Sequence, residues 1–441
     1  MINKILCLIG CCLLALGLSG CNLITADTAE LLTPPALSGD MKPIADAINK
    51  TIPQGYTLKY PSRGNYRSAV VREDINSDGV LEAFAFYSVT DGETITMHMN
   101  YIRDNDGEWS SVAVHPIIAA GVDKIEFADL NGDGVSEILV GWQIYGTSEM
   151  QLGVYSLEEN SITQRMLEKY THFLACDLDE DARNEVMIIN VSSAQENSAV
   201  LYALNEDGVT ARSFCGIDRT ATTVNEPVLA TLSNGQPAVY VDIIKGVGAV
   251  TEVLFLQNDK LLNPLFDSET GETLATLRPI SFGVRDVNED GIIDIPVQME
   301  VPSVTRSDIN EKLYLTNWCS FNGEVLTNQM TTMINVNDGY CLTLSSRMVG
   351  NIAVLKDTAA HVRELYSYNP QDMTVGTGLL YIKAIKMADW ESGKYRDERL
   401  REIMNDGKTV FACEISGAAA EYGIDMKYVQ KNFKLWKDNI N

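Results

Sequence analysis

The apolar and polar positions of this chain follow a repeated order, in which a polar loop leads into an apolar strand. In one copy Asp129, Asn131 and Asp133 alternate along the chain, Gly134 follows, and Glu137 precedes an apolar run. Alternate side chains of an extended loop project to one side, so the first three can converge on a hard cation. Glycine supplies a turn conformation that a Cβ would disfavour. The pattern predicts a unit built from a loop and the strand after it.

This unit recurs along the chain at a spacing typical of propeller blades. Clear copies begin at positions 74, 129, 177 and 286, and the last interval is about twice the first two, which are about 50 residues each. A degenerate copy within 228–244 keeps the turn and the strand but lacks the acids. Alternating runs at 94–102, 151–157, 199–205 and 250–258 predict antiparallel hairpins between the loops. We expect a mainly β, propeller-like domain over 40–337, with a sixth unit through 312–326.

The rhythm changes after residue 337, which predicts a separate small α+β domain over 338–441. The expected strands are 340–346, 351–357, 362–369, 378–387 and 409–416. A charged helix is expected at 395–404. An amphipathic helix is expected at 425–436, with Asp425 as its N-cap.

The amino terminus reads as a secretory signal over 1–20, too short to be a spanning helix. It ends in Leu18-Ser19-Gly20-Cys21, which resembles the lipobox of bacterial lipoproteins. The resemblance implies a diacylated, palmitate-bearing Cys21 that anchors the chain to the cell membrane, facing the extracellular side. The alternative is a plain cleaved signal. Residues 21–39 would be a tether, and a helix capped by Asp40 would follow.

The repeated loop resembles the FG-GAP and VCBS repeats of integrin-α-like β-propellers. That family binds calcium through side chains at loop positions one, three, five and nine and the carbonyl at seven. In the first loop these positions are Asp74, Asn76, Asp78, Val80 and Glu82. In the second they are Asp129, Asn131, Asp133, Val135 and Glu137, and in the last Asp286, Asn288, Asp290, Ile292 and Asp294.

The loop at 177 departs from this pattern, because Ala182 replaces the glycine and Arg183 stands at position seven. We expect no ion there. For all the loops the alternative is a metal-free turn, in which the carboxylates accept backbone N–H bonds. An EF-hand is excluded, because a strand follows each loop and position twelve carries no glutamate.

Composition narrows the classes of partner. The chain has 34 basic and 60 acidic residues, a formal charge of −26, which argues against nucleic acid and against docking on anionic lipid. Five cysteines follow Cys21 in apolar contexts without CxxC spacing, which favours buried thiols over disulfides. The tryptophans either fill the core, which we favour, or line a ligand groove.

No catalytic motif is present, although chance pairs among 60 acids leave glycoside chemistry open. The sequence therefore favours a non-catalytic, lipid-anchored surface protein whose repeats bind a protein or glycan. The alternative is a polysaccharide lyase or hydrolase on the same scaffold.

Overall fold

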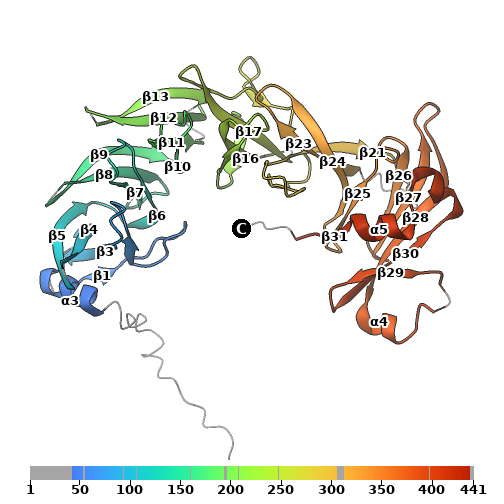
Figure 1. The fold of residues 1–441 in the computed structure, drawn as a ribbon, viewed down its shortest axis with the longest axis horizontal. Coiled ribbons are helices and arrows are strands. Elements are labelled where there is room, and N and C mark those ends of the chain that lie inside the picture. Colours follow the sequence, from blue (N-terminus) through green and yellow to red (C-terminus); the bar gives the residue numbers. More distant parts are fainter. Residues whose placement is uncertain are drawn as a thin grey trace, which may run out of the picture.

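The computed structural model describes residues 42–437, apart from 53–54, 93, 106, 159, 193–195, 207, 247, 305–311 and 397. The predicted signal, Cys21, the tether and the Asp40 cap lie outside the described residues. The chain is mainly β, and its sheets follow one another along an open arc (Figure 1). None of the helices in the described part is long and apolar enough to cross a membrane.

The first three sheets are antiparallel and use consecutive stretches of the chain. The first runs β1-β3-β4-β5, with β2 also paired to β3. Its strands are β1 (Thr57–Leu58), β2 (Val70–Glu73), β3 (Glu82–Asp91), β4 (Thr94–Asn105) and β5 (Glu108–Ile117). The second contains β6 (Gly121–Ala128), β7 (Glu137–Gln143), β8 (Met150–Glu158) and β9 (Ser161–Tyr170). The third contains β10 (His172–Cys176), β11 (Glu185–Asn190), β12 (Ser198–Asn205) and β13 (Gly208–Gly216).

The fourth sheet runs β14-β16-β17-β18, with β15 also paired to β16, and a two-stranded hairpin follows it. Its strands are β14 (Ala221–Val224), β15 (Val228–Thr231), β16 (Pro237–Lys245), β17 (Gly248–Gln257) and β18 (Lys260–Leu262). The hairpin is β19 (Phe266–Asp267) and β20 (Glu272–Thr273). The predicted hairpin strands at 94–102, 151–157, 199–205 and 250–258 are confirmed as β4, β8, β12 and β17.

Two further sheets complete the arc. The fifth runs β21-β23-β24-β25-β31, from β21 (Ile295–Val301), β23 (Leu313–Phe321), β24 (Leu326–Asn335), β25 (Tyr340–Leu344) and β31 (Phe433–Leu435). The last runs β22-β26-β27-β28-β30-β29, and β22 is parallel to β26. Its strands are β22 (Ser303–Val304), β26 (Ile352–Asp357), β27 (Val362–Asn369), β28 (Thr374–Lys386), β29 (Arg401–Asn405) and β30 (Thr409–Ile415).

The loops occupy the same place in successive sheets. Those at 74, 129 and 177 join β2 to β3, β6 to β7, and β10 to β11. The turn between β15 and β16 has this place in the fourth sheet, so the position of the degenerate copy is confirmed. The loop at 286 leads into β21 and is closed by an isolated bridge between Arg285 and Asp294.

The predicted sixth unit at 312–326 is wrong. Strand β23 pairs with β21 from Val301↔Leu313 to Ile295↔Cys319, so this stretch belongs to the fifth unit. The alternation of apolar and polar residues in this stretch indicates a half-buried strand, but no acidic loop precedes it in the sequence, so it does not begin a unit of its own. The division at 337/338 stays a prediction, although β24 and β25 pair across it and Met333 shares one core with Leu342.

The expected helix at 395–404 is also wrong. Its second half is β29, which pairs with β30 and buries Ile403. The open edge of β30 outweighs the helix preference of the charged residues. The carboxy-terminal helix is shorter than expected: α5 (Met426–Asn432) is capped by Asp425, and β31 follows because Phe433 stacks on Tyr340 in the core. The remaining expected strands are confirmed as β25, β26, β27, β28 and β30.

Helix α3 (Lys42–Thr51) covers one face of the first sheet. Ala83, Ala85 and Tyr87 of β3 pack in one cluster with Ile44 and Ile48 of α3. The alternate residues of β3, Phe84 and Phe86, pack in a second cluster that includes Ile138 and Trp142 of the next sheet. Alternation along one strand thus places the helix on one face and the second sheet on the other.

The cysteines and two of the tryptophans lie where the sequence placed them. Cys176, Cys215, Cys319, Cys341 and Cys413 are free thiols, and all but Cys215 are buried. Trp142 and Trp318 are fully buried in the core.

Candidate functional site

The four acidic loops share one pattern of hydrogen bonds. The carboxylate at position one accepts the backbone N–H of position six: Asp74 from Gly79 at 2.9 Å, Asp129 from Gly134 at 2.9 Å, Asp177 from Ala182 at 3.0 Å and Asp286 from Gly291 at 2.8 Å. The carboxylate at position five accepts the N–H of position seven at 2.8–2.9 Å in each loop. The sequence places these acids in local turns, and the structure brings each set together.

The acid at position nine is buried and closes each loop. Glu82, Glu137, Glu185 and Asp294 accept the backbone N–H of position two at 2.9–3.2 Å. Burial raises the pKa of each of these carboxyls, that of Asp294 to about 6. The charges at positions one and five raise the pKa of position nine further. Negative charge thus accumulates where a divalent cation would neutralise it.

The loops at 74, 129 and 286 fit a cation by their donor chemistry. In each, the position-three asparagine donates Nδ2 to the position-five carboxylate, from Asn76 to Asp78, Asn131 to Asp133 and Asn288 to Asp290, at 2.8–3.0 Å. Carboxylate and amide oxygens are the ligands that calcium takes. The carbonyls at Val80, Val135 and Ile292 would supply the position-seven ligand.

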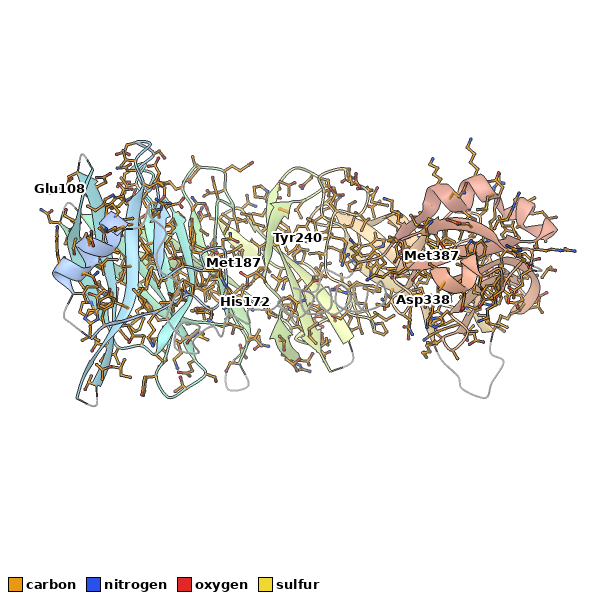
Figure 2. The ribbon with its side chains drawn as sticks, turned by 90° about the horizontal axis from the view of Figure 1, so that it is seen from below. Glu108, His172, Met187, Tyr240, Asp338 and Met387 are labelled. Carbon is orange, nitrogen blue, oxygen red and sulfur yellow. The ribbon has the colours of Figure 1, made fainter. Side chains whose placement is uncertain are left out.

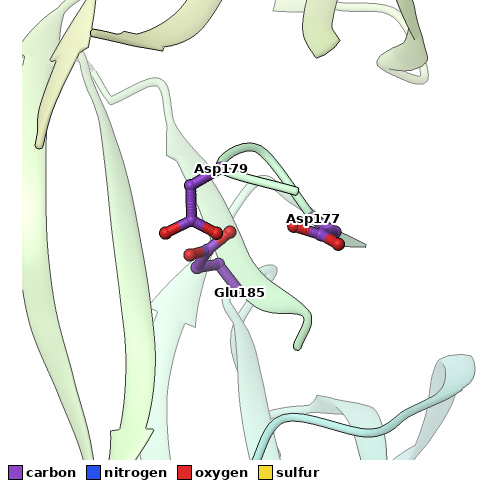
Figure 3. A group of neighbouring side chains, drawn as sticks. All are labelled: Asp177, Asp179 and Glu185. Atoms are coloured by element: carbon purple, nitrogen blue, oxygen red, sulfur yellow. The ribbon is translucent and has the colours of Figure 1, made fainter. Parts of the chain in front are cut away.

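The loop at 177 contains a convergent acidic group, yet arginines already pair with it. Ligand oxygens of Asp177, Asp179 and Glu185 lie within 4.8 Å of one another (Figure 3). Arg212 on β13 bonds to Asp179 at 2.7 Å and also to Glu185, and its charge lowers the pKa of Glu185 against the effect of burial. Arg183 donates Nε to Asp181 at 3.0 Å.

The third loop therefore does not fit a metal ion. A guanidinium bonded to two of the three acids supplies positive charge here, whereas no arginine is bonded to the acids of the other three loops among the residues that the structure describes. Ala182 adopts the left-handed conformation, at φ 68°, that glycine takes in the other loops. Arg212 also reaches Asp259 in the turn after β17, at 2.7 Å, and so ties the third sheet to the fourth.

A second constellation, the inner charge cluster, joins four consecutive sheets. It consists of Arg63, Asp123, Lys124, Glu126, Tyr170, His172 and Glu226. Arg63, from the segment between β1 and β2, pairs with Asp123 on β6 at 2.8 Å. The phenol of Tyr170 donates to the same carboxylate at 2.6 Å.

Glu226, between β14 and β15, contacts basic side chains from three other sheets. Lys124 lies 2.5 Å from it, His172 3.2 Å and Arg63 3.5 Å. Partial burial works in the opposite direction, but hydrogen bonds from His172 and Lys124 lower the pKa of Glu226 to about 2. The carboxylate is 52% exposed and stays ionised at all ordinary pH. A general acid needs the opposite shift.

Sequence reasoning did not find this cluster, because its contacts between different sheets join residues that are 54 to 163 positions apart. One signal was present. Asp123 and Lys124 stand side by side in β6, between apolar residues, and the structure shows a register shift between Val122 and Ile125 at that point. Such bulges re-aim side chains beside functional sites.

We predict that Glu226→Gln lowers stability at neutral pH and flattens acid unfolding. A carboxyl whose pKa is lower in the folded state stabilises the fold above its unfolded pKa, and this is lost as pH falls toward about 2. The free energies of unfolding of the wild type and the variant, measured by denaturant titration at several pH values, should therefore become equal below about pH 2. Glu149→Gln is the control, since Glu149 is equally exposed but pairs with Lys169 alone. Parallel pH profiles for wild type and Glu226→Gln would contradict the assignment.

We predict that Arg212→Gln destabilises the third loop in chelator and makes that loop responsive to calcium. Removing the guanidinium leaves Asp179 and Glu185 without their charge partner, so a cation gains a place. Melting temperatures in chelator and in calcium, with calcium uptake by calorimetry, measure this. Arg165→Gln on β9, which loses a pairing with Glu158, is the control. If the wild-type protein binds one calcium ion that the Asp177→Asn variant does not bind, the third loop holds metal despite Arg212, and the prediction is wrong.

Comparison with known proteins gives similarity in solved structures alone. No protein-family model matches the sequence, and no curated protein resembles it. A rhamnogalacturonan lyase from Bacillus licheniformis is 12% identical with a TM-score of 0.32, over 63% of this chain and 64% of the lyase, which is less than two thirds of it. A periplasmic gluconolactonase from Pseudomonas aeruginosa is 12% identical with a TM-score of 0.31, over 68% and 82%. A Penicillium chrysogenum α-L-arabinanase is 10% identical with a TM-score of 0.23, over 69% and 93%. All three TM-scores are below 0.5, so these proteins assign this chain neither a family nor an activity.

Proposed function

We propose that this chain is a non-catalytic, lipid-anchored bacterial surface protein whose FG-GAP- and VCBS-type repeats bind a protein or glycan partner. The observation that carries the proposal is the inner charge cluster. Its exposed carboxylate, Glu226, is held ionised by hydrogen bonds from His172 and Lys124 and lies 3.5 Å from Arg63, which suits a rigid recognition surface. The amino-terminal resemblance to a lipobox supplies the anchor at Cys21.

The carboxyls with raised pKa values support binding over hydrolysis. Glycoside hydrolysis needs an accessible carboxylic acid whose pKa is raised. In the described part of the chain, each carboxyl with a raised pKa is at most 4% exposed. They are Glu82, Glu137, Glu185, Glu252 and Asp294. Glu252, whose pKa burial raises to about 7, is fully buried beneath Thr273 and Asn263.

A panel of soluble polysaccharides tests the proposal against the enzyme alternative. Affinity electrophoresis measures retention, and assays for reducing ends and for unsaturated products measure cleavage by a hydrolase or a lyase. We expect retention of a glycan, or of a surface protein offered in a parallel binding assay, without product release. Cleavage of any of these polysaccharides would instead show that the chain is a lyase or a hydrolase.

Calcium belongs to the proposal as a stabiliser of three loops. It would be held by the side chains at positions one, three, five and nine and the carbonyl at position seven, in the loops at 74, 129 and 286. The positive charge of calcium would offset the repulsion between the carboxylates that each loop brings together. Support comes from the hydrogen bonds that these loops share and from the arginines that take the place of a cation in the third loop.

We predict that calcium raises the melting temperature of the purified chain and that magnesium does so less. At millimolar calcium and dissociation constants of roughly 0.1 to 1 mM, each site adds about 0.4 to 1.4 kcal/mol. Asp133→Ala should remove the part of this calcium-dependent rise that comes from the second loop. Asp181→Ala is a matched control, because it stands at position five of the arginine-filled loop. Equal melting temperatures in chelator, calcium and magnesium would leave the loops metal-free.

We predict that Cys21→Ser abolishes lipid attachment. The thiol is the atom that takes the diacylglyceryl group, and each buried methylene contributes about 0.8 kcal/mol to membrane binding. Palmitate labelling and detergent phase partition measure the loss, with Cys12→Ser inside the signal as the control. A labelled, membrane-bound Cys21→Ser protein would remove the anchor from the proposal.

A further inference from the structure

A buried chain of polar side chains ends at an exposed imidazole where the fifth and last sheets meet. Arg363 on β27 donates to Asn335 Oδ1 at 3.2 Å, and Asn335 Nδ2 donates to Asp338 Oδ2 at 2.7 Å. Asp338 Oδ1 lies 2.6 Å from His361 Nδ1. The side chain of Asp338 is 5% exposed and that of His361 is 59% exposed. Buried polar groups are costly unless they are paired, so this chain fixes one orientation of the imidazole.

The backbone of His361 is fixed as well as its ring. His361 lies in the turn between β26 and β27 at φ 56°, a conformation that few residues other than glycine adopt. Its carbonyl accepts the N–H of Ala384 on β28 at 3.0 Å. With Nδ1–H donated to Asp338, the second ring nitrogen, Nε2, has no partner among the residues that the structure describes. The ring therefore offers Nε2 to a molecule outside the chain.

His361 lines a hollow of about 480 Å³ with an unusual balance of charge for this protein. Lys383 and Lys386 of β28 line it too, with Tyr395 and Asp389. Asp389 pairs with Lys394 at 3.2 Å, and the ammonium of Lys383 lies 4.5 Å from the centre of the Tyr395 ring. Glu398 lies 4.0 Å from the ammonium of Lys383 as well, whereas the exposed Lys386 has no ion pair among the described residues. In a chain with a formal charge of −26, this lysine beside an imidazole leaves the hollow receptive to negative charge.

We propose that this hollow binds an oxyanion, the phosphate or carboxylate group of a small ligand. Its donors are Nε2–H of His361 and the ammonium groups of Lys386 and Lys383. Hydrogen bonds between ionised donors and oxyanions are among the strong ones. The groups around the ligand are Lys383 and Lys386 from β28, Asp389 from α4 (Met387–Glu391), Tyr395 and Glu398 from the segment after it, and Asp338 behind the imidazole. The site is independent of the acidic loops and of the inner charge cluster.

Titration of the purified chain with inorganic phosphate and, separately, with acetate tests the site. We expect a saturable shift of one histidine side-chain NMR signal, assigned to His361 by its absence in His361→Gln. Lys386→Gln should weaken binding about tenfold or more, the loss of one charge-assisted hydrogen bond. The anion that binds tighter identifies the class of ligand.

Lys434→Gln on β31 removes the same charge from an exposed position outside the hollow, and binding should be unchanged. The competing reading is that the His361–Asp338 pair only clamps two sheets together. It predicts a lower melting temperature for His361→Gln and no saturable shift in the wild type. That result, or equal weakening by Lys386→Gln and Lys434→Gln, would overturn the proposal. A melting temperature unchanged by Lys386→Gln, with weaker binding, supports it.

Discussion

The sheets with acidic loops depend on one hydrogen bond, from a backbone N–H to the carboxylate five residues before it. It recurs in the loops at 74, 129, 177 and 286, where it folds the loop back before the next strand begins. The position-nine acid then accepts an N–H from the start of the loop. The polar groups of these loops are thus satisfied within the chain, which lets the buried strands begin directly after them.

This arrangement concentrates negative charge at the loops, and the chain deals with that charge in two ways. In the third loop Arg212 and Arg183 supply positive charge from within the chain. The other three loops have an asparagine amide beside the carboxylates and no arginine bonded to the acids among the described residues. Comparison of loops within one molecule therefore separates the part of the motif that folds the chain from the part that suits a cation.

The structural features that could be predicted from the sequence are those whose signals lie within a short stretch of the chain. The acidic loops, the strands after them and the hairpins between them each follow from residues within about ten positions of one another. The degenerate fourth copy could be placed because the spacing of the others was regular. Asp425 as a helix cap is a similarly local signal, and the structure confirms it.

Contacts between distant residues were beyond such reasoning. Arg63 and Glu226 meet although 163 residues separate them, and neither stands in a motif. Arg212 is 27 residues from Glu185, so only the loop residue Arg183 was visible as a departure from the pattern. The helix expected at 395–404 failed for a related reason, since the free edge of β30 is formed by strands elsewhere in the chain.

Helix α3 has a consequence for how a chain of this design can change in length. In a closed ring the first sheet packs against the last, so the number of blades must match the circumference. Here α3 covers that face of the first sheet, and the arc stays open (Figure 1). Seen from below, the first and last sheets stand at opposite ends of the molecule (Figure 2). The last sheet presents Glu364, Lys383 and Glu414 along a surface groove. Only the curvature between neighbours is fixed, so whole units can be gained or lost within the arc without disturbing a closing contact.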